Sequence, residues 1–266
     1  MLPNSTPTPF IPSHPPKISH QPNILLTKIP TQSPIMNPLF SIHPCTPTDL
    51  PSMLNIYNLA FANDPFRLAR WPESQVPPSV FTSWLTKVFT KYLSTPHTHT
   101  WKLVENSTGN MAGWTHWAEP HVVSREEEER NKMEEEKEER ERKERGEGKF
   151  PEGSVLEICE AKVAGWNRLR EKWYKREDMF LIYFLSISPS YQKLGLGTLL
   201  LTSITNLADA QSKISYLEAT AAGYPVYVRA GFRELECMEV DLGTWGVGRN
   251  WAMVRGEGET IEEIER

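Results

Sequence analysis

Gln192-Lys193-Leu194-Gly195-Leu196-Gly197-Thr198 lies between a strand-forming run of residues and an amphipathic helix. The preceding run, Met179–Ile187, is almost uninterrupted in apolar, aromatic and β-branched residues, which predicts a strand buried on both faces. After the turn, Leu200, Ile204 and Leu207 recur at helical spacing, as expected of a helix that packs on a sheet. The predicted order is therefore strand, glycine turn, helix.

The glycine turn is typical of a site that binds a phosphate group. Gly195 and Gly197 lack the Cβ atoms that would keep a phosphate away, and the first N–H groups of the following helix have no intrahelical acceptor. The positive end of the helix dipole favours the same anion. A P-loop would place a lysine after Gly197, where this chain has Thr198. A dinucleotide-binding turn would need a third glycine near Leu200, so both of these classes are excluded.

Two motifs, in the right order and spacing, resemble those of the GNAT superfamily of acetyl-CoA-dependent N-acyltransferases. The turn matches the pattern Gln/Arg-x-x-Gly-x-Gly/Ala. After a predicted strand at Ile214–Ala219, Gly223–Phe232 looks like the family's short helix that carries Tyr-x-x-x-Gly-Phe. The resemblance implies a mixed α/β fold in which a central mixed sheet of about six to seven strands, with one splayed pair, is flanked by helices. It also implies that acetyl-CoA is the co-substrate and that the residues of the turn bind it: Gln192, Lys193, Leu194, Gly195, Leu196, Gly197 and Thr198.

Hydrophobic periodicity and turn residues predict the other elements. Thr48 is predicted to cap a helix whose apolar face includes Leu50 and Tyr57. The further predicted elements are a strand at 41–44, a helix at 78–93, a hairpin of strands 99–105 and 110–117, and closing strands at 232–242 and 250–255. Together they predict one domain over residues 40–256, of a size usual for a single core.

Residues 1–39 are predicted to be a disordered, proline-rich extension outside the fold. Residues 1–40 hold ten of the chain's 22 prolines, and no acidic residue precedes Asp49. The segment shows no apolar period. It has neither the arginines of a mitochondrial presequence nor the apolar core of a secretory signal. We expect a shorter product that begins at Met36 to keep everything that the fold needs.

A highly charged insertion occupies residues 124–150. Its segment Arg125–Arg145 contains eleven glutamates and eight lysines or arginines, which predicts either a single solvated helix or a disordered insertion. With Met133 as its one apolar residue, the segment cannot form a coiled-coil seam. No basic face suggests a nucleic-acid partner. Residues 257–266 are predicted to form an acidic tail.

The segment from Val155 to Trp173 differs from the charged insertion because its apolar residues return at helical spacing. In some relatives of the resembled family, a helix inserted before the central strand roofs the acceptor pocket, and this segment is similar in position. The alternative is an extra helix that only packs on the sheet.

Cysteine usage and hydropathy bound the surroundings of the protein. Cys45, Cys159 and Cys237 show no Cys-x-x-Cys spacing, so we expect neither a disulfide scaffold nor a metal site. A reducing compartment follows, the cytoplasm and also the nucleus, rather than secretion. No stretch approaches the roughly 20 apolar residues of a membrane helix, so no membrane partner is expected.

Acyl transfer from a thioester to an amine requires a proton donor for the leaving thiolate and a donor for the developing oxyanion. The resemblance implies that Tyr227 is the proton donor, because a phenol remains protonated at neutral pH. The alternative is that Tyr227 only packs behind Gly231 and Phe232. For the oxyanion and the pantetheine arm, the resemblance implies the backbone of the central strand at Leu185, Ser186 and Ile187.

The general base is less clearly marked in the sequence. The positions that align with the family's bases are Leu181 and Tyr183, and neither is a good base. Glu218 is the first substitute, or else a structural hydrogen-bond acceptor. His116 is the second substitute, or else a residue of the pocket rim. Proximity alone, which can remove about 7–11 kcal/mol of a barrier, is a further alternative.

For the acceptor, the candidate binding residues are Asp64, Phe66, His116 and Tyr183. Asp64 either pairs with a cationic amine or only starts a turn. Together with Phe66, the tryptophans Trp71, Trp117 and Trp166 suggest an aromatic pocket.

The sequence therefore predicts an N-acetyltransferase that moves an acetyl group from acetyl-CoA to the primary amine of a small molecule, by direct attack in a ternary complex. One alternative is a protein lysine or N-terminal acetyltransferase. The other, from a different class, is a non-catalytic CoA-binding scaffold that uses the charged insertion as its interaction arm.

Overall fold

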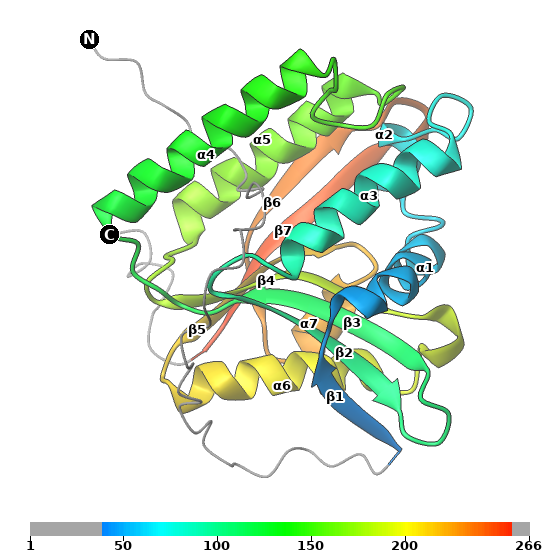
Figure 1. Ribbon diagram of the computed structural model, residues 1–266. Coiled ribbons are helices and arrows are strands. Elements are labelled where there is room, and N and C mark those ends of the chain that lie inside the picture. Colours follow the sequence, from blue (N-terminus) through cyan, green and yellow to red (C-terminus); the bar gives the residue numbers. More distant parts are fainter. Residues whose placement is uncertain (1–38, 257–266) are drawn as a thin grey trace.

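Seven strands form one sheet in the order β1-β2-β3-β4-β5-β7-β6 in this computed structural model, which describes residues 39–256 (Figure 1). The strands are β1 Phe40–Pro44, β2 Thr98–Glu105, β3 Met111–Ala118, β4 Met179–Ile187, β5 Ile214–Thr220, β6 Arg233–Asp241 and β7 Val247–Arg255. Neighbours are antiparallel except β4 and β5, which are parallel. The predicted mixed α/β fold is thus confirmed. The predictions for the proline-rich extension, for Met36 and for the acidic tail lie outside the described residues.

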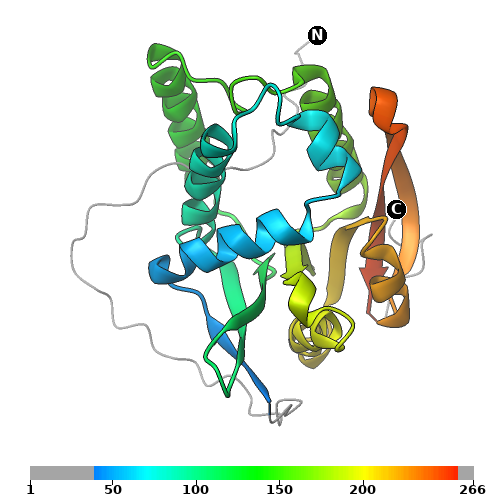
Figure 2. The same cartoon turned by 90° about the vertical axis from the view of Figure 1, so that its right-hand side faces the viewer.

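Helices cover both faces of the sheet (Figures 1 and 2). They are α1 Leu50–Ala60, α2 Pro65–Arg70, α3 Pro78–Tyr92, α4 Arg125–Glu144, α5 Leu156–Trp173, α6 Leu196–Ala210 and α7 Tyr224–Arg229. Helix α6 packs on one face, while α1, α3 and α5 lie on the other. None of the helices within residues 39–256 combines the length and apolar character needed to cross a membrane.

The central strand β4 carries a β-bulge at Tyr183. Ile182 packs in the cluster beneath α6, and simple alternation would direct Phe184 to the same face. Phe184 instead packs against α1 on the opposite face. In the β3–β4 ladder, Trp117 pairs with Ile182 and His116 with Phe184, which leaves Tyr183 as the extra residue. The bulge therefore reverses the facing of the second half of β4.

Strands β4 and β5 pair along only part of their length. The parallel ladder joins Met179–Ile182 to Ile214–Leu217 and then ends. From Glu218 to Thr220, β5 continues to pair with β7 on its other edge. Among the strands of residues 39–256, none therefore pairs with residues 183–187 of β4 on the β5 side. We call residues 183–187 and 218–220 the splay; it is the splayed pair expected from the sequence.

An aromatic cluster holds α1 and α3 on the sheet beside the splay. Trp114 of β3 is fully buried, and its ring lies 4.7 Å from that of Phe89 and 4.2 Å from that of Phe184, centroid to centroid. Its indole Nε1 donates a hydrogen bond to the carbonyl of Met53 at 3.2 Å. One side chain thus connects β3, β4, α1 and α3.

The other elements predicted from the sequence are confirmed with small shifts of their ends, but the predicted helix cap at Thr48 is wrong. A 3₁₀ turn at Pro47–Asp49 precedes α1, and Thr46 is its N-cap. The Thr46 hydroxyl and N–H both donate to the Asp49 carboxylate, at 2.9 and 2.7 Å. The physical reason is Pro47, whose fixed φ favours the first helical position and starts the turn earlier.

The charged insertion forms helix α4, the first of the two alternatives for this segment. No residue of α4 is buried, and ion pairs along its own surface, such as Glu139–Lys143 at 2.7 Å, stabilise it only weakly. The ammonium of Lys91 on α3 contacts Glu138 at 2.8 Å and so connects α4 to the rest of the domain. Figure 1 shows α4 as the outermost helix. The wider boundaries 124–150 stay a prediction.

We expect Trp114→Ala to lower the free energy of unfolding by about 3–5 kcal/mol, because it empties a buried site between two rings and removes the hydrogen bond to Met53. Urea unfolding followed by circular dichroism measures the change. Trp245→Ala is the control, since this side chain is half exposed and its removal should change stability by about 0.5 kcal/mol or less. Equal losses in both variants would contradict the role given to Trp114.

Candidate active site

The glycine turn joins β4 to the N-terminus of α6. Gly195 is the N-cap residue, and its φ of +77° is a conformation that favours glycine. The first helical bond runs from the Leu199 N–H to the Gly195 carbonyl at 3.0 Å. The N–H groups of residues 196–198 therefore have no intrahelical acceptor. They offer an anion a row of donors at the positive end of α6.

The space around the turn also suits a phosphate group. A Cβ atom at Gly195 would meet no heavy atom within 4 Å, so the approach to the turn is open. One at Gly197 would lie 3.7 Å from the side chains of Leu185 and Ile187. Gln192 donates from Nε2 to the Ile187 carbonyl at 3.0 Å. The Gln192 side chain thus holds the turn against the end of β4, and the backbone supplies the binding groups.

The backbone of β4 turns donors and acceptors toward the splay. The Ser188 N–H donates to the Ala112 carbonyl of β3 at 2.8 Å. Because successive residues of a strand direct their backbone groups to opposite edges, those of Leu185 and Ile187 point away from β3. The Ile187 carbonyl is taken by Gln192. The backbone groups of Leu185 face the splay, where no strand pairs with them.

Tyr227 of α7 packs on β5 beneath the sheet face that α6 covers. Its ring meets Phe232 edge-on, with centroids 5.8 Å apart, and a Cβ atom on Gly223 would come within 2.8 Å of it. Within residues 39–256 the hydroxyl has no hydrogen-bond partner. Burial raises the pKa of Tyr227 to about 12, so the phenol keeps its proton at neutral pH. Tyr227 is therefore both a packing residue and a proton-bearing group.

Glu218 lies at the splay and is held by an arginine of α5. Both carboxylate oxygens accept hydrogen bonds from Arg170, from Nε and Nη2, each at 2.7 Å. The Glu218 side chain is only 4% exposed. Burial alone would lower the pKa of Arg170, but the Glu218 carboxylate raises it overall. Because both oxygens are engaged, the geometry favours the alternative in which Glu218 is a structural acceptor.

His116 stands in a column of stacked rings. Its ring lies 4.0 Å from that of Tyr92 and 5.3 Å from that of Tyr183, and the Arg170 guanidinium lies 5.2 Å from the Tyr183 centroid. His116 is 2% exposed, and its Nδ1 is 3.0 Å from the Thr100 hydroxyl. Burial lowers the pKa of His116 to about 3. The imidazole is thus neutral at physiological pH and buried, not a residue of the pocket rim.

The other candidate acceptor residues separate into different places. Asp64 is the N-cap of α2, and its carboxylate accepts a backbone N–H of the first helical turn at 2.8 Å. Phe66 and Trp71 are buried on the face that α1, α3 and α5 cover, and Trp166 of α5 packs there too. Trp117 packs beneath α6 instead. Of the four rings that suggested an aromatic pocket, Trp117 does not share a face with the others, because the sheet separates it from them.

Sequence reasoning missed the charged residues of α5 that meet this face. Lys162, Trp166 and Arg170 recur every four residues, so they lie along one side of the helix. The sequence shows charged residues within the apolar stripe of this helix, but it does not show which residues they contact. Through Arg170, α5 reaches the Tyr183 ring and Glu218. Of the two alternatives for this helix, these contacts favour a roof of the acceptor pocket.

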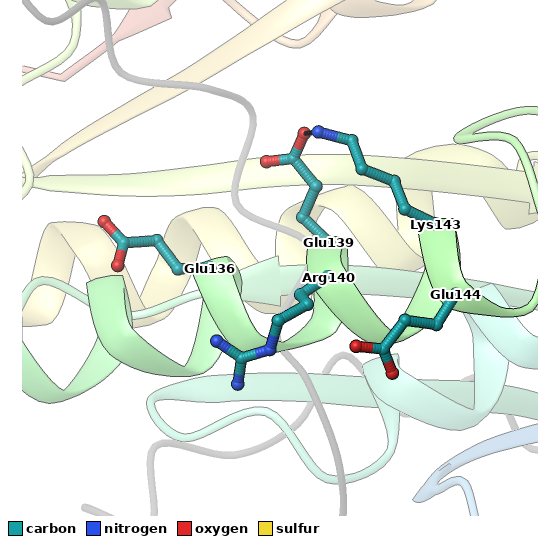
Figure 3. A pocket seen from close by; sticks show the side chains of 5 residues that line it. All are labelled: Glu136, Glu139, Arg140, Lys143 and Glu144. Atoms are coloured by element: carbon teal, nitrogen blue, oxygen red, sulfur yellow. Dashed lines mark ion pairs between the residues drawn. The ribbon is translucent and has the colours of Figure 1, made fainter.

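A hollow on α4 lies apart from this site. It is lined by Glu136, Glu139, Arg140, Lys143 and Glu144, all from one exposed helix (Figure 3). Long charged side chains border it, and the elements of the splay contribute nothing to it. We assign it no role in the reaction.

We expect the protein to lose stability as the pH falls from about 6.5 to about 3, in part through His116. The unfolded chain binds a proton on this imidazole near its ordinary pKa, whereas burial lowers the pKa in the folded state. Across that window the unfolded state therefore binds the extra proton. His116→Gln should flatten the dependence of the unfolding free energy on pH, measured by urea unfolding at several pH values. An unchanged slope in His116→Gln would contradict this prediction.

Residues 114–232 match the acetyltransferase (GNAT) family. This range contains the central strands, the glycine turn and the helix that carries Tyr227. A search of curated protein sequences found no match.

Solved acetyltransferase structures resemble the fold at low sequence identity. The polyamine N acetyltransferase of Drosophila melanogaster has a TM-score of 0.50 and 13% identity, and the match covers 82% of this chain and 99% of that one. A histone acetyltransferase HPA2 and related acetyltransferase from Corynebacterium glutamicum has a TM-score of 0.49 and 19% identity, and the match covers 84% of this chain and 98% of that one. The ribosomal-protein-S18-alanine N-acetyltransferase of Escherichia coli has a TM-score of 0.45 and 17% identity, with 84% of this chain and 96% of that one covered. The match to the acetyltransferase (GNAT) family over residues 114–232 therefore includes both the glycine turn and the splay.

Proposed function

We propose that this acetyltransferase transfers an acetyl group from acetyl-CoA to the primary amine of a small molecule, by direct attack within a ternary complex. The observation that carries the proposal is the splay. The glycine turn follows β4 at one side of it, and Tyr227 lies on α7, the helix that follows β5. A thioester that lies in the splay can reach an anion site, an oxyanion donor and a proton donor together.

The donor would lie along β4 with its phosphates at α6. The N–H groups of residues 196–198 bind the pyrophosphate, and Gly195 leaves room for it. Gln192, Lys193 and Leu194 shape this turn. The pantetheine arm pairs with the backbone of Leu185–Ile187 as an additional strand would. The geometry at the turn and the splay fits both parts of the coenzyme.

The chemistry then uses groups of this chain at three atoms. The amine nitrogen attacks the thioester carbonyl carbon, and the Leu185 N–H donates to the oxygen as it gains negative charge. The carbon–sulfur bond breaks, and Tyr227 gives its proton to the sulfur. The proton that the amine loses returns to Tyr227 through solvent. A pKa of about 12 keeps Tyr227 protonated until the thiolate forms.

We assign no direct proton transfer from the amine to Glu218 or His116. Glu218 is bound by Arg170 through both oxygens, and the pKa of His116 near 3 makes it a poor base. We propose that Glu218 positions Arg170 beside Tyr183 and that the amine reacts from its neutral fraction. Orientation of two bound reactants can account for about 7–11 kcal/mol of the barrier.

The roof formed by α5 supports a small acceptor over a peptide. Arg170 reaches from α5 to the splay, so the acceptor side is covered by a helix and its side chains. A peptide would need an open groove at this place.

All three cysteines are free, which supports our assignment to a reducing compartment, the cytoplasm or nucleus. A non-catalytic scaffold would bind coenzyme A without turnover.

We expect Gly195→Val to weaken binding of acetyl-CoA at least tenfold, because it strains a φ of +77° and places a side chain where the phosphates would lie. Isothermal titration calorimetry measures the affinity. Gly109→Val is the matched control: Gly109 has a φ of +74° and open space around it, but lies in the β2–β3 turn. Equal affinities in the two variants would argue against the turn as the coenzyme site.

We expect Tyr227→Phe to lower kcat by about 10²–10⁴ while acetyl-CoA affinity stays within a factor of three, because only the proton donor is removed. Release of coenzyme A thiol in the presence of a panel of amines gives the rate. Tyr224→Phe is the control, since that hydroxyl donates to Glu234 at 2.8 Å and should leave the rate unchanged. Full turnover by Tyr227→Phe would refute the assignment of the acid, and coenzyme binding without turnover by the wild type would support the scaffold.

A further inference from the structure

A buried lysine under the α5 roof has no partner of opposite charge. Lys162 is 4% exposed, and within residues 39–256 its ammonium makes neither a hydrogen bond nor an ion pair. Its Nζ lies 3.8 Å from the ring centroid of Phe66 and 4.7 Å from that of Trp166. Aromatic faces attract a cation, but the contribution of such a contact, about 0.5–2 kcal/mol, is well below the solvation that burial removes.

The surroundings of Lys162 are rich in donors and poor in acceptors. Within the described part of the chain, the indole Nε1 atoms of Trp71 and Trp166 are buried without an acceptor. Arg70, 8% exposed, donates from Nε to the Phe66 carbonyl at 3.2 Å and lies 3.9 Å over the Trp71 ring, with no carboxylate paired to it in the described chain. Burial, and then the charge of Arg70, lowers the pKa of Lys162. These four side chains, Arg70, Trp71, Lys162 and Trp166, are named the donor cluster below.

Nearby acidic groups form no ion pair with the donor cluster within residues 39–256. The Asp64 carboxylate accepts a backbone N–H of α2 as its N-cap, and its charge acts on Arg70 and Lys162 without direct contact. Glu218 is bound by Arg170 through both oxygens. An unpaired buried cation destabilises a fold, and a bound counter-charge removes that cost at Arg70 and Lys162.

We propose that the donor cluster binds an anionic group, a carboxylate or a phosphate, carried by the acceptor amine. The inference rests on the proposed function and specifies its substrate class. An oxygen-rich anion supplies the acceptors that the indoles, the guanidinium and the Lys162 amine lack, and its charge pairs with Arg70 and favours the protonated form of Lys162. A polyamine brings further positive charge to this place and is disfavoured.

The placement of the cluster along α5 also sets a length for the acceptor. Arg170 marks the splay, where the amine must react, and Lys162 lies eight residues before it. At 1.5 Å per residue, the two positions are roughly 12 Å apart along the helix axis. The acceptor therefore carries its amine and its anion at opposite ends of an extended body, and the rings of Phe66 and Trp166 favour apolar groups between them.

The test uses ω-amino fatty acids of increasing chain length, each compared with the alkylamine of the same length, which lacks only the carboxylate. Kinetics are measured by release of coenzyme A thiol with the full chain. We expect kcat/KM for the acid to exceed that for its alkylamine at least tenfold once the chain spans the distance. The ω-aminoalkyl phosphates form a second arm, and the preferred series identifies the anion. Equal kcat/KM values for acid and amine at all lengths would overturn the proposal.

Two variants separate binding from folding. Lys162→Met keeps the length of the side chain and removes the charge, so it should fold with an unchanged or higher Tm and reduce the preference for the acid at least tenfold. Lys172→Met is the matched control, because Lys172 also lies over a tryptophan of α5, at 4.5 Å, but is exposed and paired with Glu236 at 3.1 Å. It should keep the preference. A lower Tm in Lys162→Met with the preference intact would assign Lys162 to the fold and overturn the proposal.

A measurement without acetyl-CoA distinguishes this inference from the proposed function. The ω-amino fatty acid alone should raise the Tm of the wild type and leave that of Lys162→Met unchanged. If no amine is acetylated but this shift occurs, the anion site stands and the proposed activity fails. If amines are acetylated but neither the shift nor the preference occurs, the activity stands and the anion site is refuted.

Discussion

The site depends on one constraint, the end of the parallel pairing between β4 and β5 after Ile182 and Leu217. In an uninterrupted sheet, the backbone groups of Leu185 would be bonded to β5 and closed to any ligand. They are open because β5 leaves β4 and continues with β7. Each strand keeps a partner on its far edge, so the splay costs few hydrogen bonds. The bulge at Tyr183 also reverses the facing of β4, so that Phe184 lies on the sheet face that α1, α3 and α5 cover.

The same constraint positions the N-terminus of α6, the proposed phosphate site. Helix α6 follows β4 after a short turn, and it packs beneath both diverging strands. Its N-terminus therefore lies at the end of the strand whose backbone is exposed. Gly195 makes this arrangement possible, because its positive φ allows the chain to enter the helix with free N–H groups directed outward. Backbone groups alone thus form both the proposed phosphate site at the start of α6 and the unpaired edge of β4.

Two buried charge arrangements on α5 have opposite character. Arg170 and Glu218 form a bidentate pair that satisfies both groups, so the pair supports the fold between roof and sheet. Within residues 39–256, Lys162 and Arg70 form no ion pair; they contact aromatic faces and, for Arg70, a backbone carbonyl. Buried charges without partners reduce stability, and the ligand that we propose would offset that cost. The α5 roof thus has a structural end at Arg170 and a proposed ligand-binding end at Lys162.

The sequence by itself determined the local parts of this protein: the buried strand, the glycine turn, the amphipathic helix and the helix with Tyr227. The strand, the turn and the amphipathic helix follow from periodicity or from a backbone conformation within a few residues. The fold, the helix with Tyr227 and the proposed coenzyme role of the turn were predicted from the resemblance of two short motifs to a known family. Only the tertiary structure decided that Glu218 meets Arg170, 48 residues away, and that His116 is buried. These contacts depend on how α5 and α3 lie across the sheet. That arrangement is set by the packing of whole apolar faces, and no local pattern encodes it.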